Sequence, residues 1–560
     1  MKVADAICQA LYSEGIRVVA GITGQSIGHL ADALAEREEM SIFYTRQERV
    51  AFDICDGYAR ACGNPGVVFT DAGPAAANAI AGLVNSAGDS IPVLFFAGHN
   101  DRFEVTSGQT KEIPFVDLFS PISKWTAVIQ DATQISSIIR RAFMHLRTGR
   151  PGPVVIGMPY DLSSMEAGDF EYSPVSSLPR VRSGGDPAAI SEAVQLISAA
   201  KNPYLYVGAG VLASEASNEL VKFAELLSLP TATTLNGKSS FPEDHRLSLG
   251  IGGFRKALYG SLPATTLGNA ADVIMTIGCG FKRHATVEKP ARGVKHIQID
   301  IDPTEINREH IADIAILGDA KIVLAQLIDE AAKLPKSSRA PIDARLKLID
   351  SLKSRWAEIS KPLLLSDERP INPFRVTHEI MNLVNPDTTI VLHDAGSVRG
   401  STCQHYIAKQ PRSFLGFGVQ SAMGWTVGAA MGAKTARPEK LVIAVIGEEA
   451  LCETAMDIET SIRCHRPILF VVINNRAFAD RDGGSSPKLA NNRFSTKMDI
   501  CELAKALGAV GIKVESPSNL ADGLTRGIIS VNSGTTAIVE ILTTRVKTSL
   551  HHLFAEPLDA

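Results

Sequence analysis

Paired cysteines of the kind that bind metals are missing from this sequence. Its 560 residues include eight cysteines, and none of them forms a Cys-x-x-Cys motif. A zinc ribbon needs such pairs, and a disulfide framework needs a much denser cysteine spacing. Scattered thiols in a long chain favour a reducing compartment, and we predict a cytoplasmic protein.

The sequence also lacks long apolar runs and clusters of basic residues. No apolar run reaches the roughly 20 residues that a membrane-spanning helix needs. The formal net charge is only −4, and no basic stripe marks a surface for nucleic acid or anionic lipid. We therefore expect no membrane or nucleic-acid partner. Small molecules and other copies of the chain are the expected partners.

Short apolar runs alternate with helical patterns along three parts of the chain. The runs are continuously apolar, as in KLVIAVI and PILFVVI. Such runs are typical of parallel strands covered by helices on both faces. Polar stretches at 163–187 and 335–370 separate the three parts and are predicted linkers. We predict an α/β protein with three open, doubly wound parallel-sheet domains. The predicted domains span residues 1–165, 186–332 and 371–545.

Acidic and amide side chains follow two neighbouring predicted strands of the third domain. Gly447, Glu448 and Glu449 end one strand, and Asn474 and Asn475 end the next. Ligands of open parallel sheets bind outside the carboxyl ends of the strands. Carboxylate and amide oxygens at one edge suit Mg²⁺, which in turn favours a diphosphate. Taken alone, the same residues are more typical of helix caps and turns.

The stretch from Gly447 to Asn475 resembles the diphosphate-binding motif of thiamine-diphosphate (ThDP) enzymes, which begins Gly-Asp-Gly and ends Asn-Asn. The resemblance implies a Mg²⁺ site made by Glu448, Asn475 and the carbonyl of Ala477. Here Glu448 stands where the family has Asp, and Glu449 replaces the second Gly. Because Mg²⁺ demands near-ideal octahedral geometry, the longer side chain requires the site to shift.

Segments of the other domains resemble the acetolactate synthase-like and benzaldehyde lyase-like branch of the same family. FYTRQERVAFDICDGYAR resembles the segment with the catalytic glutamate, which would be Glu48. DAGPAAANAIAG resembles a helix start in which Pro74 matches and Ala75 replaces a glycine. GFGVQSAMGWTVGAAMGA resembles the pyrimidine-side loop, with Met423 as the apolar wedge under the cofactor. Singly, Glu48 also suits a helix cap and Met423 suits core packing. Four matches in the family's order favour the resemblance.

The resemblance implies a catalytic centre that combines residues of the first and third domains. Glu48 would share a proton with the pyrimidine nitrogen N1′, and Met423 would hold the cofactor bent. His99, as a proton shuttle, and Gln109 are further candidate catalytic residues, although His99 equally suits an ordinary surface loop. The implied cofactor contacts are Thr23, Glu48, Pro74, Asn78, Gly396, Ser397, Ser421, Met423, Gly447, Glu448, Glu449, Asn475, Ala477 and Phe478.

The expected function is that of a ThDP-dependent lyase or carboligase acting on a 2-oxo acid or a 2-hydroxy ketone. A 2-hydroxyacyl-CoA lyase or an oxalyl-CoA decarboxylase-like enzyme is an alternative within the family. A non-catalytic relative is an alternative of another class, against which the retained Glu48 argues. The central domain resembles those that bind FAD or ADP, but VGAGV (207–211) is too generic to choose between these and a domain without a ligand. A homodimer or homotetramer is implied, because family sites combine domains of two subunits.

Overall fold

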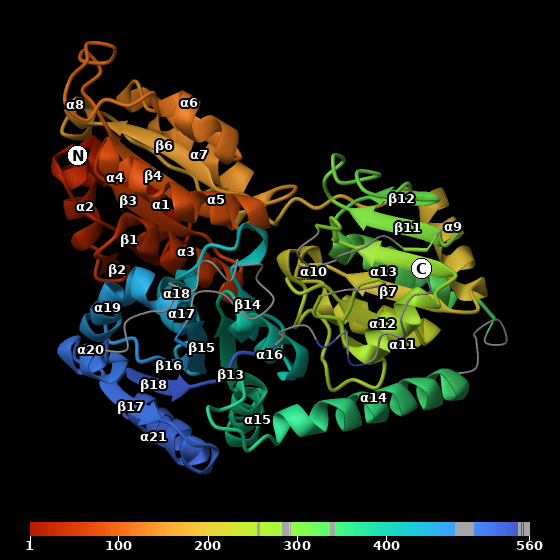
Figure 1. Ribbon diagram of the computed structural model, residues 1–560. Coiled ribbons are helices and arrows are strands. Elements are labelled where there is room, and N and C mark those ends of the chain that lie inside the picture. Colours follow the sequence, from red (N-terminus) through yellow and green to blue (C-terminus); the bar gives the residue numbers. More distant parts are fainter. Residues whose placement is uncertain are drawn as a thin grey trace.

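The computed structural model describes residues 1–254, 258–282, 290–291, 293–335, 342–476, 498–546, 550 and 553. Three six-stranded sheets follow one another along the chain, and their neighbouring strands pair in parallel. Helices pack around each sheet (Figure 1). The predicted α/β fold with three doubly wound parallel sheets is therefore confirmed. The domain boundaries given above stay a prediction.

The first sheet has the strand order β2-β1-β3-β4-β6-β5. Its inner strands are buried except for His99 at the end of β4, because continuous apolar runs such as that of β3 face helices on both sides. The strands are β1 (Val18–Gly21), β2 (Ser41–Tyr44), β3 (Gly66–Thr70), β4 (Val93–His99), β5 (Trp125–Val128) and β6 (Val154–Pro159). The helices are α1 (Val3–Ser13), α2 (Gly28–Ala35), α3 (Glu48–Cys62), α4 (Pro74–Asn78), α5 (Ile80–Asp89), α6 (Phe115–Phe119), α7 (Ile135–Arg147) and α8 (Tyr160–Ser163).

The third sheet repeats this topology, with the order β14-β13-β15-β16-β18-β17. Numbered within each domain, both sheets read 2-1-3-4-6-5. The strands are β13 (Thr389–His393), β14 (Phe414–Gly416), β15 (Leu441–Gly447), β16 (Leu469–Asn474), β17 (Val510–Val514) and β18 (Ala537–Leu542). The helices are α15 (Pro373–Leu383), α16 (Ser397–His405), α17 (Trp425–Ala436), α18 (Glu448–Thr454), α19 (Ile458–Arg463), α20 (Ile500–Ala506) and α21 (Leu520–Asn532).

The central sheet has a different order, β12-β11-β10-β7-β8-β9, which reads 3-2-1-4-5-6 from its opposite edge. That is the strand order of dinucleotide-binding folds. The strands are β7 (Pro203–Val207), β8 (Thr231–Thr233), β9 (Ser248–Ile251), β10 (Val273–Ile277), β11 (Lys295–Asp300) and β12 (Ile314–Leu317). The helices are α9 (Pro187–Ala199), α10 (Gly210–Ala213), α11 (Ser217–Leu227), α12 (Leu262–Asn269) and α13 (Ala320–Ala332), and the linker helix α14 (Ile342–Leu364) leads to the third sheet (Figure 1).

The first and third sheets share one hydrophobic core through the packing of α3 against α17. Three glycines allow this close approach. A Cβ atom at Gly57 would lie 2.3 Å from the carbonyl oxygen of Ala429, and one at Gly432 would lie 2.0 Å from that of Ile54. On the same face, Gly428 leaves room for Asp53. The helix that begins at Glu48 is therefore fixed against the third domain.

Candidate functional site

The carboxyl ends of three adjacent strands in the third sheet carry the residues predicted to bind a diphosphate. Gly396 and Ser397 follow β13, Glu448 begins α18 directly after β15, and Asn475 follows β16. These strands are neighbours. The strand order reverses between β13 and β15, which is where open α/β sheets bind ligands. The parallel pairing thus brings together residues that are far apart in the sequence.

The acidic turn at this edge is more buried than its sequence suggests. The Glu448 residue is 4% exposed, and Glu449 is half-buried. Burial raises the pKa of the Glu449 carboxyl, and the nearby Glu453 carboxylate raises it further. The two carboxylates stand in the first turn of α18, where the helix dipole favours negative charge.

The two asparagines after β16 have different surroundings. The amide of Asn474 is buried and donates to the Glu540 carboxylate at 2.6 Å, so this side chain serves the sheet interior. Asn475 is half-buried at the edge of the sheet. Two further predicted contacts, Ala477 and Phe478, lie outside the described residues.

The carboxyl edge of the first sheet gathers the predicted pyrimidine-side residues in the same manner. Thr23 follows β1, Glu48 begins α3 after β2, Pro74 opens α4 after β3, and His99 ends β4. These four strands are contiguous in the order β2-β1-β3-β4. The half-buried Glu48 accepts a hydrogen bond from the side-chain amide of Asn78 at 3.3 Å.

The two other candidate catalytic side chains lie at the margin of this edge. The His99 ring packs edge-on against Phe115, and its Nδ1 is 3.1 Å from the carbonyl oxygen of Asn100. Gln109 lies in the exposed loop between β4 and α6. Among the residues that the structure describes, the Gln109 side chain has no hydrogen bond to another predicted site residue.

The start of α3 and the loop before α17 are joined within one chain. Arg49 donates to the carbonyl of Met423 and forms an ion pair with Glu453 at 3.1 Å. Met423 is half-buried against the shared core, and Ser421 adopts a left-handed backbone with φ 56°. Glu48 and the predicted wedge residue therefore belong to one packed unit.

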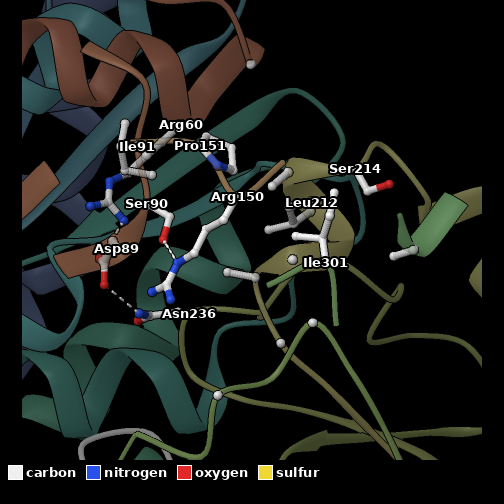
Figure 2. A pocket seen from close by; sticks show the side chains of 18 of the residues that line it. Arg60, Asp89, Ser90, Ile91, Arg150, Pro151, Leu212, Ser214, Asn236 and Ile301 are labelled. Carbon is white, nitrogen blue, oxygen red and sulfur yellow. Dashed lines mark hydrogen bonds and ion pairs between the residues drawn. The ribbon is translucent and has the colours of Figure 1, made fainter. Parts of the chain in front are cut away.

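A cavity of about 310 Å³ lies where the three domains meet (Figure 2). It opens at the carboxyl ends of β7 and β10, between which the order of the central sheet reverses. The glycine turn 208–210 and residues 278–282 line it from the central domain. From the third domain Arg412 and Val419 reach it. Its volume and its position are typical of a ligand pocket.

Asp89 connects the three domains at the wall of this cavity (Figure 2). Its carboxylate pairs with Arg60 at 2.9 Å and accepts from the side-chain amide of Asn236 at 3.1 Å. It also accepts from the backbone N–H of Val419 at 3.1 Å. Because Val419 lies just before Ser421, the cavity wall is continuous with the pyrimidine-side loop.

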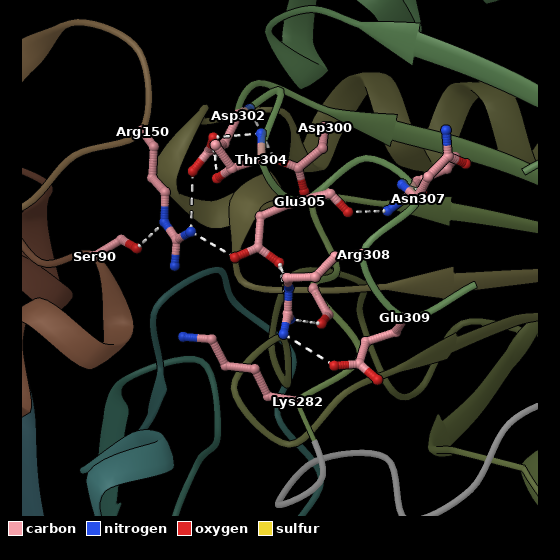
Figure 3. A network of polar contacts seen from close by, with 12 residues as sticks. Ser90, Arg150, Lys282, Asp300, Asp302, Thr304, Glu305, Asn307, Arg308 and Glu309 are labelled. Atoms are coloured by element: carbon pink, nitrogen blue, oxygen red, sulfur yellow. Dashed lines mark hydrogen bonds and ion pairs between the residues drawn. The ribbon is translucent and has the colours of Figure 1, made fainter. Parts of the chain in front are cut away.

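A second polar network spans the cavity between the first and central domains (Figure 3). Arg150 donates to Ser90 at 2.7 Å and pairs with Asp302 at 3.1 Å and Glu305 at 2.6 Å. Burial raises the pKa of Asp300, at the end of β11, to about 6. The cavity is thus lined by the Asp300 carboxyl at the end of β11 and by arginines of the other domains, such as Arg150 and Arg412.

Three family models cover most of the chain. The N-terminal TPP binding domain of thiamine pyrophosphate enzymes matches residues 1–118, the central domain matches 190–327, and the C-terminal TPP binding domain matches 394–541. The chain belongs to the thiamine pyrophosphate enzymes. The family identified from the sequence motifs is thereby confirmed, as is the expectation of an enzyme.

Full-length relatives place this ThDP-dependent enzyme in the acetolactate synthase-like branch. A probable acetolactate synthase large subunit of Methanocaldococcus jannaschii is 32% identical over 546 residues, which cover 95% of this chain and 90% of the relative. The acetolactate synthase isozyme 3 large subunit of Escherichia coli is 28% identical, with 96% and 94% covered. A glyoxylate carboligase of Escherichia coli O157:H7 is also 28% identical, with 98% and 94% covered.

The third-sheet edge of this ThDP enzyme fits a metal-bound diphosphate. Glu448 and Asn475 offer the hard oxygen donors that Mg²⁺ prefers. A Cβ atom at Gly396 or Gly447 would meet no atom within 4 Å, so the edge is open where a diphosphate would lie. These four residues would hold the group together with the N–H groups of the α16 first turn. The roles of these four residues stay a prediction, as does that of the Ala477 carbonyl.

One positioning residue of the enzyme was not predicted from the sequence. Asp394 is fully buried after β13 and accepts hydrogen bonds from the backbone N–H groups of Ala395, Gly424 and Thr426 at 2.8–3.2 Å. It thereby ties the loop of Gly396 to the pyrimidine-side loop. The sequence feature that could have indicated this role is an Asp directly after an apolar strand.

Among the described residues, no helix is both long and apolar enough to cross a membrane.

Proposed function

We propose that this enzyme is a ThDP- and Mg²⁺-dependent carboligase that acts on a 2-oxo acid. When bound, ThDP supplies a nucleophilic carbon and an electron sink for cleavage next to a carbonyl. The observation that carries the proposal is the convergence of Gly396, Glu448 and Asn475 at an open sheet edge, in a chain that aligns with acetolactate synthases over 95% of its length. The comparisons favour neither the acyl-CoA alternatives nor a non-catalytic relative.

Different residues of the chain would bind the two ends of the cofactor, the diphosphate and the pyrimidine. Glu448 and Asn475 bind the metal that neutralises the diphosphate. Glu48 hydrogen-bonds N1′ of the pyrimidine and holds or releases a proton there. Met423 would pack against the cofactor from the loop before α17. Because Glu48 and Glu448 begin helices and Asn475 follows a strand, their positions are set before the substrate arrives.

Substrate-side groups come from the first sheet. His99, which ends β4, would serve as the proton shuttle of the proposed chemistry, and Thr23 lies in the turn after β1. Gln109 would join them from its exposed loop. We propose these residues as the lining of the substrate side, in a cytoplasmic homodimer or homotetramer. Light scattering of the purified protein measures the assembly, and a monomer at working concentration would contradict it.

The function is tested by adding ThDP and Mg²⁺ to the purified protein. Melting temperature and near-UV circular dichroism should both respond. Incubation with pyruvate, glyoxylate, benzoin-type ketones and hydroxyacyl-CoA thioesters should then release CO₂ and yield a C–C ligation product only from 2-oxo acids. Cofactor binding without turnover of any substrate would reject the carboligase. Turnover of a thioester would select the acyl-CoA alternative.

We also propose that FAD or ADP occupies the three-domain cavity. The supporting features are the dinucleotide-type strand order, the glycine turn 208–210 and the carboxyl of Asp300 at a strand end, where a ribose hydroxyl would be bound. Heat-released cofactor is identified by chromatography and visible absorption, and ADP binding by calorimetry. The variant Asp300→Ala should lose the ligand. Absence of both ligands would leave a central domain that serves as structure alone.

A further inference from the structure

One carboxylate links three segments at the carboxyl edge of the first sheet. Asp71 directly follows β3, and its side chain is 15% exposed. It accepts hydrogen bonds from the backbone N–H of Ser26 at 3.0 Å and from the Ser26 hydroxyl. It also pairs with the ammonium group of Lys111 at 2.6 Å. The turn after β1, the turn after β3 and the loop after β4 therefore meet at Asp71.

The backbone of Lys111 is fixed at the same place. Its φ angle of 65° lies in the left-handed region, which residues other than glycine rarely adopt. A Cβ atom at Gly73, directly before Pro74, would lie 2.8 Å from the Cα of Lys111, so the loop packs against the turn after β3. Uncommon backbone conformations that the surrounding contacts maintain are frequent at ligand-binding sites.

The loop that carries Lys111 is ordered by its own hydrogen bonds. The side-chain amide of Asn100 donates to the carbonyl of Thr110 at 2.9 Å. The Glu112 carboxylate accepts from the backbone N–H groups of Gly108 at 2.7 Å and Gln109 at 3.2 Å. These contacts surround Lys111 in the sequence, so its ammonium group is held from both the loop and the sheet.

Lys111 lies on the same half of the catalytic centre as the proposed substrate-side residues. Those residues belong to the same domain of the same chain, namely Thr23, His99 and Gln109. Gly98, directly before His99, packs against the Ser26 hydroxyl, because a Cβ atom at Gly98 would lie 2.9 Å from it. The group around Asp71 is therefore next to the end of β4, and its geometry is set within one domain, whichever third domain completes the site.

The arginines near this edge have partners in other directions. Arg102, on the same loop, pairs with Asp161 after β6 at 2.7 Å. Arg46 and Arg49 pair with carboxylates of the third domain of their own chain. Among the residues that the structure describes, Lys111 donates to Asp71, whereas an ammonium group carries three N–H donors. The Lys111 side chain is 36% exposed, so its ammonium group is accessible to a ligand at the edge.

The chemistry of a carboligase indicates which substrate group a fixed ammonium would bind. Of two 2-oxo acids that react, the first loses CO₂ when the bond between its carboxyl and oxo carbons breaks. The second keeps its carboxylate, while its oxo carbon forms the new C–C bond and its oxo oxygen takes up one proton. A cation beside the first carboxylate would stabilise a charge that the reaction removes, and would oppose the reaction. A cation beside the second carboxylate has no such cost.

We propose that Lys111 binds the carboxylate of the acceptor 2-oxo acid, which is the substrate that is not decarboxylated. This inference rests on the proposed carboligase function. Asp71 and Ser26 hold the ammonium group in place. Lys111 thereby favours acids over neutral aldehydes as acceptors, and so determines which product is formed.

The test measures the products of Lys111→Met, Lys111→Arg and Arg102→Met from pyruvate, with and without acetaldehyde as a neutral acceptor. Arg102 is a matched control, because it stands on the same loop, is similarly exposed and also pairs with an aspartate. The measured quantities are CO₂, the hydroxy-oxo acid formed from two pyruvates, and the acetoin formed with acetaldehyde.

In Lys111→Met the ratio of hydroxy-oxo acid to acetoin should fall about 10–10²-fold, because only the acid acceptor loses a hydrogen bond between charged groups. With saturating acetaldehyde, CO₂ release and acetoin formation should stay near the wild-type rates. Lys111→Arg keeps the charge and should recover part of the ratio. Arg102→Met should keep the wild-type ratio. If Lys111 only tethered the loop, its loss would lower all products in proportion.

Chemical labelling gives a second measurement, which needs no variant and no turnover. In wild-type protein without ThDP, an amine-reactive acyl reagent should modify Lys111 severalfold more slowly with pyruvate than with pyruvamide. Pyruvamide has nearly the same shape but lacks the charge. Peptide mass spectrometry measures the modified fraction.

An unchanged product ratio in Lys111→Met, or an equal change in Arg102→Met, would overturn the assignment. If Lys111→Met does not fold, equal labelling with pyruvate and pyruvamide would overturn it. The proposed function fails by a different observation, namely wild-type protein that binds ThDP but forms no ligation product from 2-oxo acids. In that case the labelling still decides whether Lys111 binds a carboxylate.

Discussion

Replacement of Asp457 by Asn should make the protein more stable at neutral pH and leave its stability in acid unchanged. Asp457 is 1% exposed between α18 and α19. Its Oδ1 accepts from the backbone N–H of Arg46 at 2.8 Å and from Thr460 Oγ1 at 2.9 Å. An Asn side chain can accept both bonds through its own Oδ1 and carries no charge.

The magnitude follows from the pKa of the buried carboxyl. Burial is the main cause that raises the pKa of Asp457 from 3.8 to about 6. The folded state therefore holds this proton more tightly than the unfolded state. The stability that Asp457 contributes is fully present below its unfolded pKa of 3.8 and is lost as the pH rises through about 6. A shift of about two units corresponds to about 3 kcal/mol.

The assay is urea denaturation of the apoprotein across this pH range, for wild type, Asp457→Asn and the exposed control Asp522→Asn. The advantage of Asp457→Asn should be near zero around pH 4 and approach about 3 kcal/mol above pH 7. The control should stay within a few tenths of a kcal/mol of wild type at every pH. A pH-independent difference, or a less stable Asp457→Asn at neutral pH, would refute the argument.

Three further substitutions test the site and its support. Gly57→Ala would place a Cβ 2.3 Å from a backbone oxygen of α17, so it should lower the free energy of unfolding by about 1–3 kcal/mol and lower turnover. The control Gly28→Ala, which has open space around it, should leave melting temperature and activity unchanged. Glu48→Gln should keep the melting temperature and ThDP affinity but cut turnover by about 10²-fold or more, and near-normal turnover would remove Glu48 from the mechanism. Glu448→Ala should raise the ThDP dissociation constant about tenfold or more in a Mg²⁺-dependent manner, while Glu448→Asp should bind normally. Equal affinities in calorimetry would show that other groups hold the metal.

The three-sheet fold could be predicted because parallel strands have a strong local signature. Runs such as 441–446 and 469–473 are apolar at every position, which is typical of strands covered on both faces. Once the sheet is parallel, its carboxyl ends meet at one edge, so the proximity of Glu448 and Asn475 follows from chain direction alone. The sequence also showed which residues belong to that edge, because they directly follow the apolar runs.

The arrangement between domains could not be predicted, because it depends on pairs of residues hundreds of positions apart. Nothing near Asp56 indicates that its carboxylate accepts from the indole N–H of Trp425 at 2.9 Å. The strand order of the central sheet and the cavity beside it are likewise tertiary properties. The difference between Asn474 and Asn475 depends on Glu540 across the sheet, which is a partner that the motif does not contain.

The close packing of α3 on α17 joins the first and third domains of one chain into one packed unit. Glycine weakens a helix by about 1 kcal/mol relative to alanine, yet this interface keeps Gly57, Gly428 and Gly432. The same close approach buries Asp53, whose pKa is raised well above its ordinary value by burial. Both features reduce stability where a simpler apolar interface would increase it. Their common effect is to hold α3, which begins with Glu48, close against α17 of the same chain, and the proposed site needs that fixed helix start more than it needs additional stability.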